Sequence, residues 1–353
     1  MTSVLPDPAD ELASEHARQV EMLEMAILCA GAGSSVDEAV RARATAFCEQ
    51  VRHAPDGWAH ALRLLEATQQ PLPKFYALST LQEFLGGRSG VADGTKSISE
   101  PARSEVRAVL LSWLRKSADG IGREESYVRT KLGVVIALLI KSDYPERWTT
   151  AFEDLFAFLQ HGPAMVDLFL RTLHAVDEEI VMYHVDRPAD EVEHNVLIKD
   201  TMRSTACIRD TCAALYDVIA TYHTALPDLA ALGLRTLKLY IGWIEITHVV
   251  NEKFLPLLLQ CLQAPLLRAA ACECLYEIVN KGMDDNAKLL LLHQLQLFQL
   301  LKSVTLEDSS DDDEFPSKVA EVVNAAMVQL LQCFDSLEVR RRKRRERYHC
   351  VRQ

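Results

Sequence analysis

The sequence predicts an all-α fold, an α-α superhelix in which antiparallel helix pairs stack as a HEAT- or armadillo-like solenoid. Apolar residues recur at spacings of three and four, as in Val20, Leu23 and Ile27, which places one apolar stripe on each helix. Hydrophobic residues make up 49% of the chain and aromatic residues only 7%, a composition that suits helix-on-helix packing. The 353 residues also exceed the roughly 250–300 residues of a single compact core, which favours a repeat array.

The apolar stripes predict a continuous series of helices. Their expected ranges are 11–30, 36–52, 57–68, 73–86, 100–117, 124–142, 147–160, 163–183, 189–222, 226–243, 251–262, 264–281, 284–302 and 315–336. Six prolines near expected helix starts or turns lie 38 to 46 residues apart, close to the period of about 40–47 residues of HEAT and armadillo repeats. They are Pro55, Pro101, Pro145, Pro188, Pro227 and Pro265.

Two segments interrupt the helical pattern. Residues 86–99 are rich in Gly and Ser and predict a surface loop, because they lack the Gly-Lys-Ser/Thr order of a phosphate-binding loop and follow no strand. Residues 307–314 (EDSSDDDE) predict an acidic loop between helices.

The net charge of −12 combines an acidic body with a basic end. Residues 340–353 carry eight Lys and Arg and one Glu, so a tail of +7 follows a body of −19. An acidic body excludes a general nucleic-acid coat, and any RNA contact must come from basic side chains clustered on one surface. Nine cysteines without framework spacing, and an N-terminus unlike a secretory leader, indicate a reducing intracellular compartment. No apolar stretch reaches the roughly 18 residues of a membrane span, so no membrane insertion is expected.

The sequence contains no constellation of residues typical of an enzyme. His-Glu-x-x-His, Cys-x-x-Cys pairs, Gly-x-Ser-x-Gly and Gly-x-Gly-x-x-Gly after a strand are all missing. Cys272 and Cys274 are two positions apart in a helical stretch, so their side chains diverge by about 200° and cannot share a metal ion. We therefore expect no catalytic residues, no metal, no cofactor and no small-molecule substrate.

Several short motifs carry polar residues that leucine spacing alone does not explain. In chain order they are residues 127–131 (YVRTK), 144–148 (YPERW), 166–181 (VDLFLRTLHAVDEEIV), 197–203 (LIKDTMR), 243–245 (WIE), 250–254 (VNEKF) and 275–284 (LYEIVNKGMD). They resemble motifs of the exportin-T family, the tRNA-specific branch of the importin-β or karyopherin superfamily. The matches keep family order from about residue 36 to 336, and they correspond to the N-terminal portion of a longer family protein.

The resemblance implies a nuclear export receptor that binds the GTPase Ran in its GTP form cooperatively with tRNA. Such a receptor also contacts nucleoporins of the nuclear pore and shuttles between nucleus and cytoplasm. GTP hydrolysis would belong to Ran, so the receptor itself is not an enzyme. The alternative is a short HEAT-repeat protein-binding scaffold without transport activity.

The resemblance also divides the chain into six expected parts. These are an N-terminal extension at 1–35, importin-β N-terminal-like HEAT repeats at 36–160, exportin-like HEAT repeats at 161–302, the acidic loop at 303–314, a terminal helix at 315–339 and the basic tail at 340–353. The tail has no counterpart in the family pattern. It is either a nuclear-localisation or RNA-binding run or, as we prefer, translated non-coding sequence from a truncated gene model.

For Ran, the resemblance implicates the inner helices of the first repeats and an acidic loop. The corresponding candidates are Gln82, Glu83, Arg129, Lys131, Asp311, Asp312 and Asp313. In the alternative interpretation, Arg129 and Lys131 are surface charges paired with the nearby Glu124 and Glu125, and the acidic loop is merely solvated.

For tRNA, Lys199 and Arg203 are four residues apart, which places both on one face of a helix where they could bind phosphates. The alternative is an intramolecular clamp between repeats. Trp148 and Trp243 are expected to pack inside or between repeats and not to stack on bases.

Overall fold

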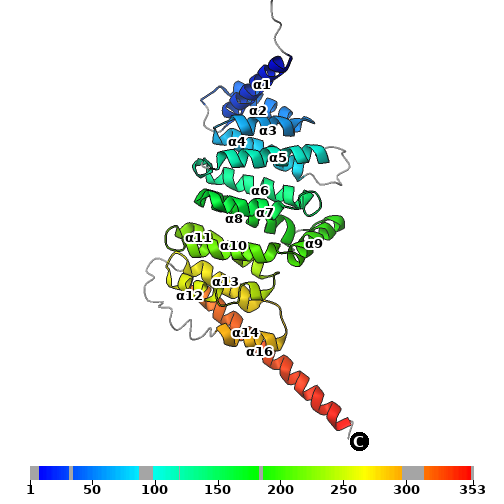
Figure 1. Cartoon of the computed structure of the whole chain (residues 1–353), viewed down its shortest axis with the longest axis vertical. Coiled ribbons are helices and arrows are strands. Elements are labelled where there is room, and N and C mark those ends of the chain that lie inside the picture. Colours follow the sequence, from blue (N-terminus) through cyan, green and yellow to red (C-terminus); the bar gives the residue numbers. More distant parts are fainter. Residues whose placement is uncertain are drawn as a thin grey trace, which may run out of the picture. The chain divides into compact units, whose positions relative to one another are not determined.

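The computed structural model describes residues 8–31, 35–86, 98–118, 120–182, 186–295 and 314–350, and these residues contain helices but no strand. They form two compact units, Met1–Ile198 and Lys199–Gln353. Within each unit, antiparallel helices pair and the pairs stack, so the predicted all-α class is confirmed (Figure 1). The division at residue 160, which was based on types of repeat, stays a prediction.

The described residues of the first unit form eight complete helices and the first part of a ninth. They are α1 (Pro8–Ala30), α2 (Glu38–His53), α3 (Gly57–Ala67), α4 (Pro71–Leu85), α5 (Glu100–Ser117), α6 (Ser126–Asp143), α7 (Ala151–Phe158), α8 (Pro163–Val176) and α9 (Ala189–Ser204). Short turns of 3-10 helix lie at Ile121–Arg123 and Leu159–His161, and α8 continues into a π-helical turn, η3, at Asp177–Val181. The second helices of successive pairs lie against one another, since α6 contacts both α4 and α8.

The second unit repeats this plan. It contains the last residues of α9, followed by α10 (Cys207–Tyr222), α11 (Pro227–Ile241), α12 (Phe254–Gln263), α13 (Arg268–Asn280), α14 (Asp285–Leu295) and α16 (Glu314–Cys350), with a 3-10 turn at Ile246–His248. Here α13 lies against α11 and α16 as α6 lies against α4 and α8. Both units therefore use a central row of helices covered on two sides.

Proline begins several of these helices. Pro71, Pro101, Pro163 and Pro227 occupy the first turns of α4, α5, α8 and α11. The missing N–H costs nothing at a helix start, and the fixed φ angle already suits the helix. The sequence-based placement of Pro101 and Pro227 at helix starts is thus confirmed.

The core is mainly aliphatic, and both helices of each pair contribute buried positions to it. Leu78 of α4, Ile136 of α6, Leu168 of α8, Leu237 of α11 and Ile278 of α13 have no solvent-exposed surface. Each such side chain contributes about 1.5–3 kcal/mol of burial free energy. These buried side chains belong to the apolar stripes that the sequence predicted.

The predicted single helix at 189–222 is wrong, because the structure has two helices, α9 and α10, in its place. Thr205 makes the break: its hydroxyl donates to the Thr201 carbonyl oxygen (2.9 Å) and accepts from the Cys207 amide nitrogen (3.4 Å). The hydroxyl of such a residue competes with the backbone hydrogen bonds of a helix. Apolar periodicity does not register a break this short.

The last helix is longer than predicted, since α16 continues past residue 336 to Cys350. Lys and Arg are good helix formers, so a basic run need not end a helix. The predicted loops at 86–99 and 307–314 fall largely outside the described residues, as do positions 296–302 of the predicted helix at 284–302.

Gly133 allows α6 and α8 to approach closely. A Cβ atom at Gly133 would lie 3.1 Å from the backbone carbon of Arg171 and 3.1 Å from the Thr172 nitrogen. Backbone atoms of a packed helix cannot move aside as a flexible side chain can, so the two helices would have to separate.

We expect Gly133→Ala to lower the free energy of unfolding by about 1–3 kcal/mol, the usual range for overpacking. Gly242→Ala is the matched control, because a Cβ atom at Gly242 meets no atom within 4 Å. Urea unfolding followed by circular dichroism measures both variants. Equal stability of the two variants would contradict the close approach.

Asp177, in the π-helical turn, is a buried carboxylic acid. Its exposed fraction is 6%, and burial, with a smaller contribution from the charge of Glu178, raises its pKa to about 6. The folded state therefore holds a proton on Asp177 that the unfolded chain releases near pH 4. This group's contribution to stability is full below about pH 4 and is lost as the pH rises to about 6.

We expect Asp177→Asn to remove this pH dependence and to stabilise the protein at pH 7 by at most about 3 kcal/mol. Unfolding free energies of wild type and variant, measured in parallel from pH 4 to pH 7, should diverge as the pH rises. A constant difference across this range would show that Asp177 is not buried as described.

Candidate functional site

The four described residues predicted to contact Ran lie on neighbouring helices. Gln82 and Glu83 belong to α4, and Arg129 and Lys131 belong to α6. The Lys131 ammonium donates to Gln82 Oε1 at 2.6 Å, and Arg129 pairs with Asp167 of α8 at 2.9 Å. The structure thus joins residues about 50 positions apart in sequence into one polar surface.

This surface, which we call the charge row, crosses from α2 to α8. Its members are Arg52, Gln82, Glu83, Arg129, Lys131, Asp167 and Arg171. Arg52 lies 3.7 Å from the Glu83 carboxylate. Arg171 donates to Asp167 at 2.7 Å and to the Thr130 hydroxyl at 2.6 Å. Every helix of the row is therefore tied to the next by a polar contact.

The alternative partners expected for Arg129 and Lys131 are wrong. Glu124 accepts from Lys74, which lies on α4, and Glu125 is the N-cap residue of α6. The partners of Arg129 and Lys131 lie instead on the adjacent helices. Sequence spacing predicts pairs within a helix, and it carries no information on pairs between helices.

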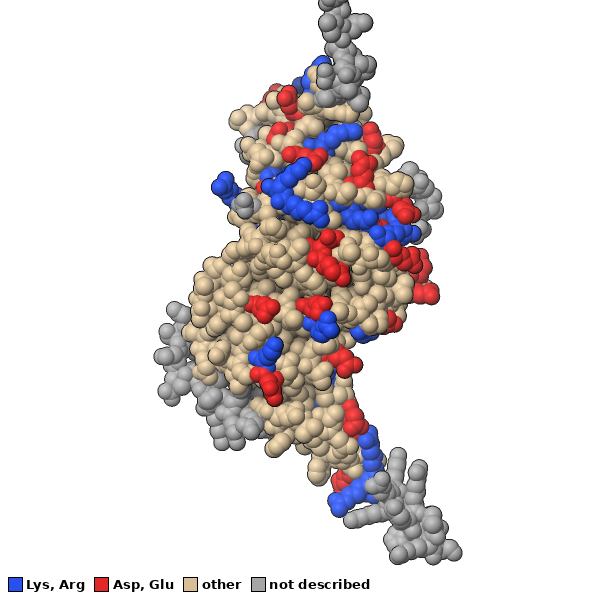
Figure 2. Space-filling model, in the orientation of Figure 1, with Lys and Arg blue, Asp and Glu red and all other residues tan. Residues whose placement is uncertain are grey.

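The charge row has four basic side chains and the carboxylates of Glu83 and Asp167, and Glu49, which pairs with Arg52 at 3.2 Å, adds a third carboxylate beside it. Burial lowers the pKa of Lys131, an effect that the charge of Glu83 opposes, and its ammonium lies 5.1 Å from the centre of the Phe75 ring. The buried Nε of Arg129 has no hydrogen-bond partner among the described residues. Figure 2 shows basic side chains in a band over the first unit, with acidic side chains on both sides of it.

The two residues predicted to contact tRNA differ in exposure. Lys199 is only 4% exposed, whereas the Arg203 side chain is 39% exposed. Arg203 donates to Asp200 Oδ1 (2.9 Å) and to the Trp243 carbonyl oxygen (3.2 Å), and its guanidinium lies 5.3 Å from the Trp243 ring centre. These contacts are those of an intramolecular clamp. Of the two residues, Arg203 lies at the surface and Lys199 is buried.

The remaining predicted residues are placed as follows. Asp311, Asp312 and Asp313 lie outside the described residues. Trp148 is 5% exposed and its ring nitrogen donates to Asp154 Oδ2 at 2.8 Å, so its predicted packing role is confirmed. Trp243 is half-buried beside Tyr240, with 5.4 Å between the ring centres.

Several polar residues of the sequence motifs form joints between helices. Asp143, next to the YPERW motif, accepts from Arg103 at 2.8 Å and from Arg107 at 2.7 Å. Asn251 orders the turn before α12, since its Oδ1 accepts from the amides of Lys253 and Phe254, each at 3.0 Å. Lys281 of the VNKGMD motif donates to the carbonyl oxygen of Ile241 at 3.0 Å. These motif residues are structural.

Sequence reasoning missed Arg52, Asp167 and Arg171 of the charge row. Arg52 lies in no motif, whereas Asp167 and Arg171 lie inside the 166–181 motif, although nothing in the sequence connects that motif to α4 or α6. Within the described ranges, no group of three His, Cys, Asp or Glu side chains could hold a metal ion, and no helix is long and apolar enough to cross a membrane. Cys274 is fully enclosed, and burial raises the pKa of its thiol.

Comparison with known proteins identifies the relatives of this chain. Residues 125–275 match the family of exportin 1-like proteins. Exportin-T of Dictyostelium discoideum is 34% identical over 304 residues, which cover 86% of this chain and 27% of that protein. Exportin-T of Arabidopsis thaliana and of Homo sapiens are each 30% identical, over 89% and 90% of this chain and 32% of their own length.

A solved structure shares the fold. The exportin Cse1 in its cargo-free, cytoplasmic state matches 88% of this chain and 34% of its own, with a TM-score of 0.54 and 13% identity. At 13% identity, this match shows a shared fold and does not show a shared function. The chain is thus similar in sequence to exportin-T proteins, and it spans about a third of their length.

Proposed function

We propose that this chain serves nuclear export of tRNA, as the part of a receptor that binds Ran in its GTP form and cooperates with tRNA. The observation that carries the proposal is the match to exportin-T proteins along about nine tenths of the chain. The helix-pair architecture supports it, because a stack of pairs offers an extended surface to large partners. The GTP belongs to Ran, so the chain needs no catalytic residues.

The charge row is the proposed Ran contact. Its side chains are held by hydrogen bonds and ion pairs, most of them between helices, which an acidic partner surface could replace. The Arg129 and Asp167 side chains are only 20% and 14% exposed, so a partner that draws Arg129 away has to supply a carboxylate in place of Asp167. The net positive charge favours a partner surface that is acidic.

Directional export requires that the two ligands assist each other. If Ran-GTP raises the affinity for tRNA, tRNA raises the affinity for Ran-GTP by the same factor, typically worth about 1–3 kcal/mol. Hydrolysis of GTP then weakens both interactions together. Contacts with nucleoporins and shuttling between nucleus and cytoplasm belong to the same proposal.

A protein-binding scaffold without transport activity is the second candidate. It is supported by the stacked helix pairs of the described residues, because such an extended surface binds protein partners whether or not transport follows. Such a scaffold would use the same helix-pair surface but would not distinguish the nucleotide bound to Ran.

We expect the chain to retain Ran loaded with a GTP analogue in preference to Ran-GDP. The double variant Arg129→Ala, Lys131→Ala should weaken binding at least about tenfold, because it removes two of the row's four positive charges. Arg209→Ala is the control, since Arg209 is exposed and lies in the second unit. Surface plasmon resonance measures the affinity of the wild type, the double variant and the control for Ran. Equal affinity of the wild type for Ran bound to the GTP analogue and Ran-GDP would favour the scaffold.

For tRNA, we expect Arg203→Gln to weaken binding and to reduce the slope of log K against log salt by about 0.9 or less, as for one lost phosphate contact. Lys199→Met should instead lower the free energy of unfolding by about 1–3 kcal/mol, because it removes a buried donor. Gel-shift titrations with and without Ran-GTP, beside urea unfolding, separate these effects. If Arg203→Gln leaves the tRNA affinity unchanged, Arg203 serves only as the intramolecular clamp.

A further inference from the structure

The last part of α16 carries a dense run of positive charge. Seven of the eight residues at 340–347 are Lys or Arg, and Glu346 is the one acid among them. Helix α16 is continuous from Glu314 to Cys350, so the run lies along a single helix. Eight helical residues rise about 12 Å, which gives about one basic residue for every 1.7 Å of helix axis.

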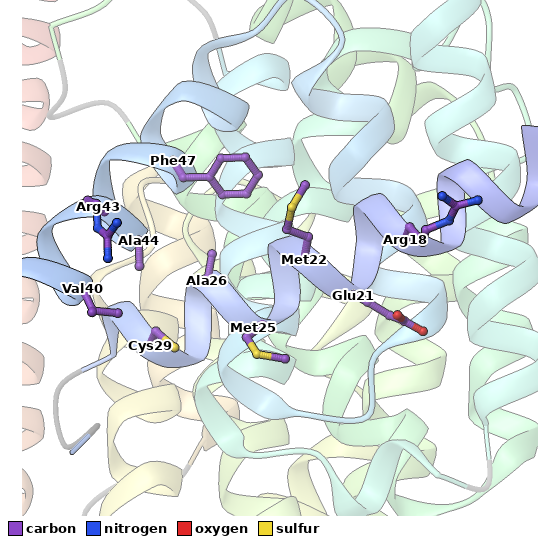
Figure 3. A pocket seen from close by; sticks show the side chains of 10 residues that line it. All are labelled: Arg18, Glu21, Met22, Met25, Ala26, Cys29, Val40, Arg43, Ala44 and Phe47. Carbon is purple, nitrogen blue, oxygen red and sulfur yellow. The ribbon is translucent and has the colours of Figure 1, made fainter. Parts of the chain in front are cut away.

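Basic side chains of the first unit are arranged differently. In the charge row, they alternate with the carboxylates of Glu83 and Asp167. At the pocket between α1 and α2, Arg18 and Arg43 stand apart, with apolar side chains between them (Figure 3). Neither surface presents the unbroken positive charge of residues 340–345.

The start of the basic run is fixed against α14. Arg340 lies 2.9 Å from the Asp285 carboxylate, which also accepts from the Ser336 hydroxyl at 2.7 Å. Arg342 pairs within its own helix, with Glu338 at 3.0 Å, and its side chain is 73% exposed. Beyond this anchor, α16 extends away from the other helices of the second unit (Figure 1). The helix that carries the run is therefore held at one end and accessible to a large partner.

The composition of the run indicates the kind of partner. Six consecutive basic residues, about 100° apart around the axis, occupy every side of the helix. A helix that lies on a membrane or in a protein groove needs an apolar face, and residues 340–347 have none. The exposed apolar residues of α16, among them Leu331 and Phe334, come before the run. The partner of this segment must therefore be recognised by its charge.

A nucleic-acid duplex matches both the sign and the spacing of this charge. Double-stranded DNA carries one negative charge for about every 1.7 Å of its axis, so about 12 Å of duplex presents about seven phosphate charges. That number equals the seven basic residues of the run. Six of the seven are Arg, whose planar guanidinium can hold two phosphate oxygens at once.

We propose that residues 340–347 of α16 bind the phosphodiester backbone of a nucleic-acid duplex without reading its sequence. Contacts with phosphates fix a protein on a duplex and carry no sequence information. Residues 1–339, with their net charge of −19, repel the same backbone, which limits the contact to this helix. The site contains neither Arg203 nor any residue of the charge row, so it is independent of Ran and of the proposed export function. RNA and DNA duplexes share this chemistry, and separate arms of the test distinguish them.

The test measures the fluorescence anisotropy of labelled RNA and DNA duplexes, each of about 20 base pairs, with the full chain over a series of salt concentrations. Permuting the duplex sequence should change the affinity less than about threefold. Arg341→Gln, Lys343→Gln and Arg344→Gln together should weaken binding at least about tenfold and lower the slope of log K against log salt by about 2–3, or about 0.9 for each lost contact. Gln is a good helix former, so the variant keeps the helix.

The matched control is the triple variant Arg209→Gln, Arg235→Gln and Lys253→Gln. It removes the same charge from exposed positions of the second unit and should leave the slope unchanged. Arg341→Lys with Arg344→Lys keeps the charge of the run and should also retain the slope.

Two other anionic partners are compared with the duplexes: vesicles of phosphatidylcholine and phosphatidylserine, and polyglutamate. Each should bind more weakly than the tighter-binding duplex, because a duplex releases its condensed counterions when it is bound. The ratio of the RNA and DNA affinities then identifies the source of the backbone. Absence of duplex binding, equal slopes of the two Gln triple variants, or binding of vesicles or polyglutamate as tight as that of the duplex would overturn the proposal.

Discussion

The fold depends on burial of the second helix of each pair between two neighbours. Helix α6 contacts α4 on one side and α8 on the other, and Val135, Ile136 and Ile140 lose all contact with solvent. A helix that is apolar around most of its circumference is stable only where both sides are covered. No pair could therefore fold alone, and the stability of each is shared with its neighbours.

Polar joints fix how these apolar helices meet. The Asp143 carboxylate holds two arginines of α5, and Lys281 reaches back to the C-terminal end of α11, where its charge meets the negative end of the helix dipole. Such contacts add little free energy but exclude other registers, since a shifted helix would leave a buried charge unpaired. The apolar stripes hold the pairs together, and the polar joints set their geometry.

This division explains what the sequence could predict. Leucine periodicity predicted the helix class and the bounds of α5 to the residue, because the apolar stripe of a helix is formed by residues close together in the sequence. It missed the Thr205 break between α9 and α10, where one hydroxyl outweighs the apolar pattern. It also gave Arg129 and Lys131 the wrong partners, because Asp167 and Gln82 lie on other helices about 40 to 50 residues away. The four-residue spacing of Lys199 and Arg203 in LIKDTMR predicted that both could contact tRNA, yet Lys199 is buried.

The Asp167 carboxylate holds Arg129 and Arg171 at once, at 2.9 Å and 2.7 Å. If a visiting acidic group draws one arginine away, the other still neutralises Asp167, and no orphaned charge is left behind. Capture and release can then proceed as a swap of counter-ions, without a large electrostatic barrier in either direction. If the charge row is the proposed Ran contact, the two arginines on one carboxylate would make that contact readily reversible.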